Sequence, residues 1–131
     1  MNNHVGDNGT GATFVTANGV KYKRFLNESV FRNPTEIAVF FDEHPDSIND
    51  GLGVLPVPAQ IEWRDLPASH HGLACGFSFA DGHSEIKRWR NPSTTKPVTG
   101  GGRASLGLTI TPPASELSDV SWLATRSTET Y

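Results

Sequence analysis

The stretch that most constrains the fold runs from Leu73 to Trp89 and reads LACGFSFADGHSEIKRW. In its first half, large apolar side chains alternate with small ones, which is the period of two expected of a strand with one buried face. Asp81-Gly82 then supplies a residue pair that readily adopts positive φ in a tight turn. The residues from His83 onward are mostly polar and read as the returning strand. The sequence therefore predicts a β-hairpin.

The composition favours short strands and loops around this hairpin. The chain has 131 residues, among them 13 glycines and 9 prolines. This length fits one small domain, and so much Gly and Pro is not typical of layers of long helices. A further strand is predicted at Glu36 to Phe41 (EIAVFF), whose near-continuous apolar run is typical of a central strand covered on both faces. The expected class is α+β: a small antiparallel sheet with a central Asp-Gly hairpin, short helices and long loops.

Composition also divides the chain into three parts. Residues 1–96 contain the predicted strands and are expected to form the globular domain. Residues 97–114 are rich in Gly, Pro and Thr, which is typical of a flexible connection. Residues 115–131 begin with an amphipathic segment, Ser115 to Thr125, which predicts a short carboxy-terminal helix followed by a tail.

Charge and cysteine content exclude several classes of protein. The net charge of -3 argues against nucleic acid as a partner. No apolar run approaches the ~20 residues that span a bilayer, and no secretory signal is present. Cys75 is the only cysteine, which excludes an internal disulfide. Because it lies on the apolar side of the predicted strand, we interpret it as a small buried hydrophobe.

Several segments together resemble a known family. His71 is followed, after nine residues, by Asp81 and Gly82, and this spacing is similar to a carboxy-terminal signature of bacterial type II secretion pseudopilin-like proteins. Three further segments are similar to one branch of that family: FFDEHPDSINDG (Phe40 to Gly51), WRDLPASHHG (Trp63 to Gly72) and DVSWLATRST (Asp119 to Thr128). The resemblance extends from about Tyr22 to Thr128.

The resemblance implies a structural role. Proteins of this family begin with a short leader and a long apolar helix that anchors the subunit in the inner membrane. Since the chain has no such segment, it is expected to be the globular carboxy-terminal portion, on the periplasmic or extracellular face of that membrane. The implied function is a structural and interaction module of a type II secretion or pilus-like apparatus. Its partners would be other pseudopilin or secretion-apparatus subunits. It would contact the membrane only through the missing helix. An apolar patch left by that helix could also make the fragment a homodimer.

An acidic loop after the predicted strand at Glu36 to Phe41 is the first candidate site. Calcium takes about six to eight oxygen ligands, and the resemblance adds that major pseudopilins bind calcium through a loop. The loop is not an EF-hand, because counting from Asp46 places Ile48 at the third position and Val57 at the twelfth. The alternative is a solvated loop in which Asp46 and Asn49 cap turns. The candidate calcium ligands are Asp42, Glu43, Asp46, Asn49 and Asp50.

Histidines offer a second kind of metal site. Three converging side chains could bind Zn²⁺ and leave a position open for water. No HExxH motif and no cysteine pair enforces such convergence. The alternative for His71 is a structural hydrogen bond to the hairpin or to a neighbouring loop. The candidate ligands near predicted strand ends are His44, His70, His71 and His83, which Asp42 and Asp81 could join.

Paired carboxylates give a third candidate, a small hydrolase acting on glycosides. That chemistry needs a carboxylic acid and a carboxylate about 5–9.5 Å apart. Asp42 or Glu43 could supply one, with His44 as a further catalytic group. Asp81 or Glu85 on the hairpin could supply the other, and Trp63 or Trp89 a surface on which a sugar stacks.

Two observations argue against this hydrolase. The turn accounts for Asp81, and successive strand residues such as Asp42 and Glu43 point to opposite faces. The hydrolase is therefore an alternative to the structural module, and a calcium-stabilised binding domain without catalysis is a second alternative.

Overall fold

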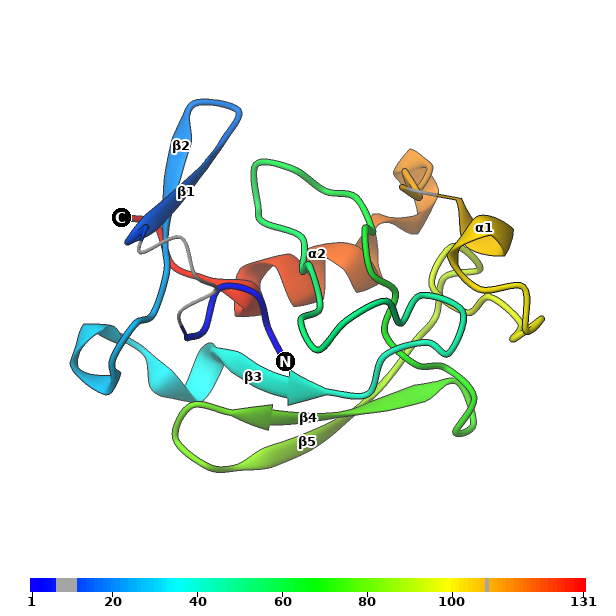
Figure 1. Ribbon diagram of the computed structural model, residues 1–131, viewed down its shortest axis with the longest axis horizontal. Coiled ribbons are helices and arrows are strands. Elements are labelled where there is room, and N and C mark those ends of the chain that lie inside the picture. The colour runs from blue at the N-terminus through cyan, green and yellow to red at the C-terminus, as the bar shows by residue number, and fades with distance from the viewer. Residues whose placement is uncertain (7–11, 108) are drawn as a thin grey trace.

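The main sheet has three antiparallel strands with the hairpin at its centre. The computed structural model describes residues 1–6, 12–107 and 109–131. In it β4 (Ala74–Phe79) lies between β3 (Ala38–Phe41) and β5 (Ser84–Arg88) (Figure 1). A second sheet pairs β1 (Phe14–Ala17) with β2 (Val20–Lys23). The expected α+β class is confirmed.

Helices are few and mostly short. The longest described helix is α2 (Leu117–Ser127), which includes most of the segment predicted to be helical near the carboxy terminus. A single turn, α1 (Arg103–Leu106), precedes it. Short 3-10 turns occupy Glu28–Val30, Pro34–Glu36 and Ala114–Glu116. No described helix is long and apolar enough to cross a membrane.

The predicted hairpin is formed by β4 and β5, as expected. Gly82 has a φ of 93°, a conformation that glycine adopts without the clash of a Cβ. Its amide donates a 3.0 Å hydrogen bond to the carbonyl oxygen of Phe79, and the amide of Phe79 bonds the carbonyl oxygen of His83 at 2.9 Å. The Asp81 carboxylate accepts a further 3.2 Å bond from the backbone amide of His83. The turn therefore uses Asp81 and Gly82 in the way their sequence predicts.

The predicted central strand at Glu36 to Phe41 is wrong in its position and its extent. β3 begins at Ala38 and lies at the edge of the sheet, while Glu36 belongs to a 3-10 turn. Its outer edge meets Asn2, whose backbone amide donates a 2.8 Å hydrogen bond to the carbonyl oxygen of Val39. An apolar run does not distinguish a central strand from an edge strand, because strand order depends on pairing with distant residues. The face of β3 turned away from the core is also uncovered, and Phe40 on that face is 58% exposed.

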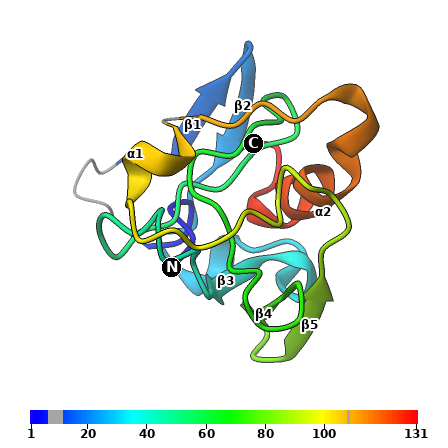
Figure 2. The ribbon, with the colours of Figure 1, turned by 90° about the vertical axis from the view of Figure 1, so that its right-hand side faces the viewer.

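The main core lies between the inner face of this sheet and α2. In two perpendicular views α2 lies between the β1–β2 hairpin and the β3–β4–β5 sheet (Figures 1 and 2). Phe77 of β4 is in this core, with the Trp122 ring of α2 packed edge-on against it at 5.3 Å between ring centroids. Cys75 is buried as predicted, and burial raises the pKa of its thiol to about 12. The core also contains Trp63, Leu66, Trp89, Val120 and Leu123.

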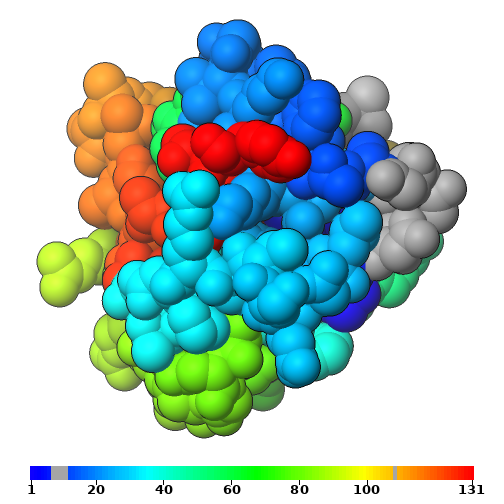
Figure 3. All heavy atoms as spheres, turned by 90° about the vertical axis from the view of Figure 1, so that its left-hand side faces the viewer, coloured from blue at the N-terminus to red at the C-terminus, as the bar shows by residue number. Residues whose placement is uncertain are grey.

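The two ends of the chain pair with β2 and with the residues that follow it. The carboxy-terminal residues lie along β2, and Thr130 pairs with Tyr22. Figure 3 shows these last residues between the β1–β2 hairpin and residues 24–36. The Glu129 carboxylate accepts a hydrogen bond from the backbone amide of Asn33 at 2.8 Å and lies 2.9 Å from Lys23 Nζ. At the other end, His4 and Gly6 bond the backbone of Phe25.

Candidate functional site

The outer face of the β3–β4–β5 sheet carries exposed apolar side chains. Residues directly opposite one another on paired strands project on the same side of a sheet. Phe40 is opposite Ser78, and Gly76 is opposite Ile86, so these residues share the side turned away from the core. Ile86 is 83% exposed. We call the surface made by Phe40, Gly76, Ser78, Ser84 and Ile86 the outer face.

A shallow groove of about 520 Å³ follows the outer face. Gly76 lies on its floor, and a Cβ placed there would be in ordinary van der Waals contact, 3.8 Å from the Asp42 carboxylate. Asp42 therefore lies over Gly76 at the end of β3, beside the exposed side chains of Phe40 and Ile86. The groove is lined by two large exposed apolar side chains, Phe40 and Ile86, and by two acidic residues, Asp42 and Glu85, an arrangement suited to contact with another protein surface.

Asp46 of the acidic loop is committed to a distant segment. It is buried, and its carboxylate accepts hydrogen bonds from the amide and the hydroxyl of Thr99 at 2.7 and 2.9 Å. A third bond, at 3.3 Å, comes from the amide of Gly102. These bonds, that from the Thr99 amide above all, hold the pKa of the Asp46 carboxyl below its usual range. Asp46 thus fastens residues 99–102 to the loop and does not cap its own turn.

The other predicted calcium ligands point to separate partners. Glu43 accepts a 2.8 Å hydrogen bond from the Ser47 hydroxyl, and burial raises the pKa of Glu43. Asp50 caps a turn by accepting a 2.7 Å bond from the amide of Leu52, and Asn49 is exposed. Among the described residues, no three His, Cys, Asp or Glu side chains are placed to hold a metal ion. Calcium binding stays a prediction, and this geometry does not favour it.

His44 is a buried structural residue. Its Nδ1 accepts a 3.1 Å hydrogen bond from the amide of Asp46, and its Nε2 lies 3.0 Å from the carbonyl oxygen of Lys96. A neutral ring with the proton on Nε2 satisfies both contacts. Because both nitrogens are engaged, His44 is not arranged to transfer a proton or to bind a metal with Asp42 and Glu43.

The signature residues occupy opposite ends of β4. The six residues of β4 span about 20 Å, with His71 before the strand and Asp81-Gly82 after it. His71 is exposed, and its ring centroid lies 4.2 Å from that of His70. Within the described part of the chain, the His71 side chain makes no hydrogen bond, so the structural bond considered for it is absent there. The signature therefore frames the central strand, and its members do not meet in one site.

A small charged cluster lies at the hairpin tip. His83 Nδ1 is 2.6 Å from the Asp81 carboxylate, and His83 Nε2 is 3.5 Å from that of Glu85. The bond with Asp81, more than the charge of Glu85, raises the pKa of His83, and the same bond lowers the pKa of Asp81. The His83 ring also stacks on Phe79, with 4.3 Å between centroids. The cluster stabilises the turn and the start of β5.

Asp42 and Glu85, one of the proposed carboxylate pairs, both line the groove along the outer face, but the strand register places their side chains on opposite sides of the sheet. Glu85 is opposite the buried Phe77, so its side chain leaves the sheet on the inner side, whereas Asp42 lies over Gly76 on the outer side. The suggested sugar-stacking surface is wrong, because Trp63 and Trp89 are both buried in the main core. Their rings pack edge-on against each other at 6.3 Å, where no sugar can reach them.

The residues of the outer face are not among those that the sequence predicts to be functional. A local signal for Ile86 exists, since it is a single apolar residue in the otherwise polar strand SEIKR. Nothing in the local sequence shows that Phe40 is exposed, because its neighbours Val39 and Phe41 are equally apolar. In the structure both of these neighbours are half-buried.

In the comparisons with known proteins, no protein-family model matches the chain. Neither a curated protein sequence nor a solved structure matches it significantly.

Proposed function

We propose that this chain is a pseudopilin-like structural and interaction module of a type II secretion or related pilus-like apparatus. The outer face would be the surface that contacts another subunit of that apparatus. The observation that carries the proposal is the exposure of Phe40 and Ile86 on an uncovered sheet face (58% and 83%). The order of His71 and Asp81-Gly82 along β4, in the pattern of the family signature, supports the assignment to that kind of apparatus.

The chemistry of the outer face suits an interface. Complete burial of a side chain as large as Phe or Ile contributes about 1.5–3 kcal/mol, so covering Phe40 and Ile86 together would favour association. Asp42 at the end of the groove offers a carboxylate to a basic or amide group at the rim of the partner. Ser78 on β4 lies between the two apolar residues and Ser84 lies beside Ile86 on β5, and both add hydroxyl groups.

The state of the acidic loop supports a role without catalysis. A hydrolase needs two carboxylates converging on one substrate, and Asp46, Glu43 and Asp50 are each bonded to a separate part of the chain. His44 has both ring nitrogens engaged. In this proposal the loop positions β3 and the segment after Lys96, and the outer face makes the external contact.

The location follows from the same proposal. A pseudopilin-like module would lie on the periplasmic or extracellular face of the inner membrane, and a longer form of the protein would carry the anchoring helix. Its partners would be other pseudopilin or secretion-apparatus subunits.

Photo-crosslinking from single positions tests this proposal. A photoreactive amino acid replaces Ile86 in the protein as expressed in its own cells, and crosslinked partners are identified by mass spectrometry. Ile48 is the matched control, because it is an apolar residue of the acidic loop that is 58% exposed, as Phe40 is. We expect crosslinks to secretion-apparatus subunits from position 86 and not from position 48. Equal crosslinking from both positions, or none from position 86, would contradict the proposal.

A further inference from the structure

β5 is an edge strand whose ladder with β4 follows a regular alternation. In two perpendicular views it is the outermost strand of its sheet (Figures 1 and 2). At one end of the ladder, the amide of Trp89 donates a 2.7 Å hydrogen bond to the carbonyl oxygen of Leu73. At the other end, the amide of Phe79 donates one of 2.9 Å to the carbonyl oxygen of His83. Since bonded and non-bonded pairs alternate in an antiparallel ladder, the odd-numbered residues of β5 bond β4 and the even-numbered ones do not.

The even-numbered residues of β5 therefore direct their backbone amides and carbonyl groups to the outside of the sheet. These residues are Ser84, Ile86 and Arg88, and all three are exposed. Within residues 1–6, 12–107 and 109–131, no group bonds these amides or carbonyl oxygens. A strand edge with such a row of unpaired groups is a template for pairing with another strand.

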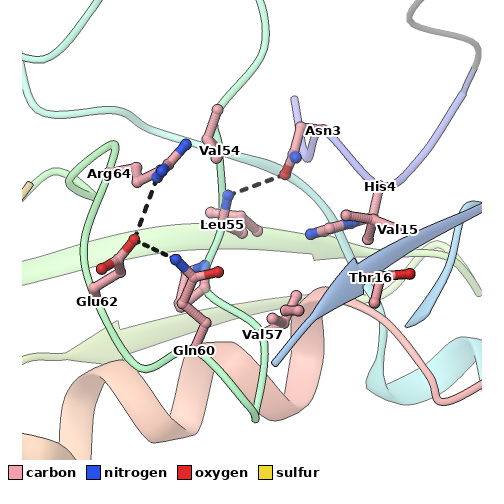
Figure 4. Close-up of a pocket in the computed structure, with 12 residues that line it drawn as sticks. Asn3, His4, Val15, Thr16, Val54, Leu55, Val57, Gln60, Glu62 and Arg64 are labelled. Atoms are coloured by element: carbon pink, nitrogen blue, oxygen red, sulfur yellow. Dashed lines mark hydrogen bonds and ion pairs between the residues drawn. The ribbon is translucent and has the colours of Figure 1, made fainter. Parts of the chain in front are cut away.

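The other strands lie beside further segments of the same chain. β3 meets Asn2, and Thr130 near the carboxy terminus pairs with Tyr22 of β2. β1 borders a cavity of about 310 Å³, and His4 and the loop from Val54 to Arg64 also line this cavity (Figure 4). The edge of β5 is thus the place where a strand from another molecule can extend the main sheet.

The sequence of β5, SEIKR, is complementary to itself in one antiparallel register. When Ile86 is opposite Ile86 of a second copy, Glu85 is opposite Lys87 of that copy, and the same contact repeats on the other side. Opposite charges in directly opposed positions stabilise a strand pair, and like charges destabilise it. Glu85 and Lys87 both leave the sheet on its inner side, because their partners on β4 face the core.

The backbone favours the same register. Ile86 forms a hydrogen-bonded pair with its counterpart, because its amide and its carbonyl group both point outward. Ser84 and Arg88 form the two flanking pairs, which gives about six main-chain hydrogen bonds across the interface. Glu85 and Lys87 fall at the non-bonded pairs, where facing side chains are closest.

Neighbouring antiparallel registers are unfavourable. Sliding the pairing by two residues places Glu85 opposite Glu85 in one direction and Lys87 opposite Lys87 in the other. Sliding it by one residue places outward-pointing backbone groups opposite residues whose own groups bond β4, so the ladder cannot form. The charges and the backbone therefore select one register, the one centred on Ile86.

Both charges already lie beside the edge in the single chain. Lys87 Nζ is 5.0 Å from the centroid of the Trp122 ring, which holds the ammonium group at the inner side of β5. The Glu85 side chain is 51% exposed, and one carboxylate oxygen is 3.5 Å from His83 Nε2. An arriving strand therefore meets one positive and one negative group at fixed positions along the edge.

We propose that two copies of this chain pair through their β5 edges, in the antiparallel register centred on Ile86. The three strands of each copy then form one continuous sheet. The two-fold axis is perpendicular to this sheet, so the two outer faces lie on the same side and the two Ile86 side chains become neighbours. Because the paired strands are short, we expect a weak dimer, with a Kd of about 10–500 µM. The inference does not depend on the function proposed for the outer face.

Sedimentation velocity over a range of concentrations, with a set of charge variants, tests this dimer. Glu85→Lys places two positive charges opposite each other at both contacts and should raise the Kd at least about tenfold. Adding Lys87→Glu to it restores opposite charges and the net charge of -3, so the double variant should dimerise within about threefold of the unmodified chain. The matched control is Glu28→Lys, the same change of charge at an exposed residue away from β5, and it should leave the Kd unchanged.

Amide hydrogen exchange on the unmodified chain locates the contact. The amides of Ser84, Ile86 and Arg88 should exchange freely in dilute solution and severalfold more slowly at concentrations above the Kd. The amide of Ile48, in the acidic loop, should exchange at the same rate at all concentrations.

Three outcomes would overturn the inference. A chain that stays monomeric up to about 1 mM forms no such dimer. A dimer in which the three even-numbered amides stay unprotected uses another surface. A double charge variant that dimerises as weakly as Glu85→Lys refutes the register. If a charge variant does not fold, the exchange rates of the unmodified chain still decide whether the β5 edge is the contact.

Discussion

The acidic loop (residues 42–51) and the outer face adjoin in the fold but engage their side chains differently. In the loop, Asp46 and His44 are buried and bonded to residues about fifty positions away, Thr99 and Lys96. On the outer face, Phe40 and Ile86 project into solvent and only small side chains lie between them. The loop has the acidic residues and the histidine expected of a catalytic or metal site. In the fold its buried side chains instead hold distant segments of the chain together. The outer face has an ordinary composition and is the surface left free for contact.

The largest expected effect comes from removing a buried group of the loop. His44→Ala leaves a cavity and deprives the Asp46 amide and the Lys96 carbonyl of their partner. We expect it to lower the free energy of unfolding by about 3–4 kcal/mol, measured by urea denaturation. The matched control is His71→Ala, an exposed histidine whose loss should change that free energy by less than about 0.5 kcal/mol. Equal effects of the two substitutions would contradict the structural role given to His44.

Acidification should lower the free energy of unfolding through the buried His4, and this is the second-largest effect that we expect. The unfolded chain protonates His4 near its ordinary pKa of 6.5, whereas the folded chain does so only near pH 4. Because the unfolded state binds more protons in this window, stability falls as the pH decreases from about 6.5 to 4. The expected loss is about 3 kcal/mol, from 2.5 pH units at 1.36 kcal/mol each.

Urea denaturation at several pH values measures this loss. Glu62, Arg64 and Arg24 also lie near His4 or its cavity, so the control is a His4→Gln variant that retains all three charges. Its stability should depend less on pH across this window, and an unchanged slope would contradict the assignment to His4.

The Asp46 carboxylate should also cause stability to fall as the pH decreases, by a smaller amount than His4. Its folded pKa is lowered, so its contribution is present above the ordinary pKa and is lost as the pH falls through the folded value. Asp46→Asn should therefore lower the urea midpoint at pH 7, and the difference from the unmodified chain should shrink at low pH. Asp42→Asn, on an exposed carboxylate, is the control and should leave the midpoint unchanged.

Calcium should have the smallest effect, because the loop carboxylates are already bonded within the chain. We expect the same melting temperature with EDTA and with added Ca²⁺. A calcium concentration about 100 times its Kd would stabilise a true site by about 2.7 kcal/mol. A rise of that size would show that the loop rearranges around the ion, and it would contradict the fastening role.

The sequence predicts the hairpin well because its determinants are local. The alternation through β4 and the conformation of Gly82 depend on neighbouring residues alone. The strand order is not determined locally, because a run such as EIAVFF has the same composition whether it lies at the centre of a sheet or at its edge. Only pairing with β4, more than thirty residues later, places Phe40 on an open face.

The candidate sites were harder to predict for the same reason. Asp46 accepts a hydrogen bond from Thr99, which is 53 residues later in the sequence, and no pattern near either residue predicts that contact. His4 is buried only because its backbone pairs with Phe25 and the loop around Leu55 closes over it. The sequence identifies conspicuous residues such as Asp42, Glu43 and His44. Distant contacts determine whether those residues are engaged within the fold or free.

The most direct test of the contrast changes the outer face and leaves the loop intact. A Phe40→Lys, Ile86→Lys double variant replaces exposed side chains, so its free energy of unfolding should stay within about 1 kcal/mol of the unmodified chain. Its association with secretion-apparatus subunits, measured by co-purification from its own cells, should be lost, while an Ile48→Lys variant associates normally. Association that persists in the double variant, with the fold intact, would contradict the claim that the outer face is the contact surface.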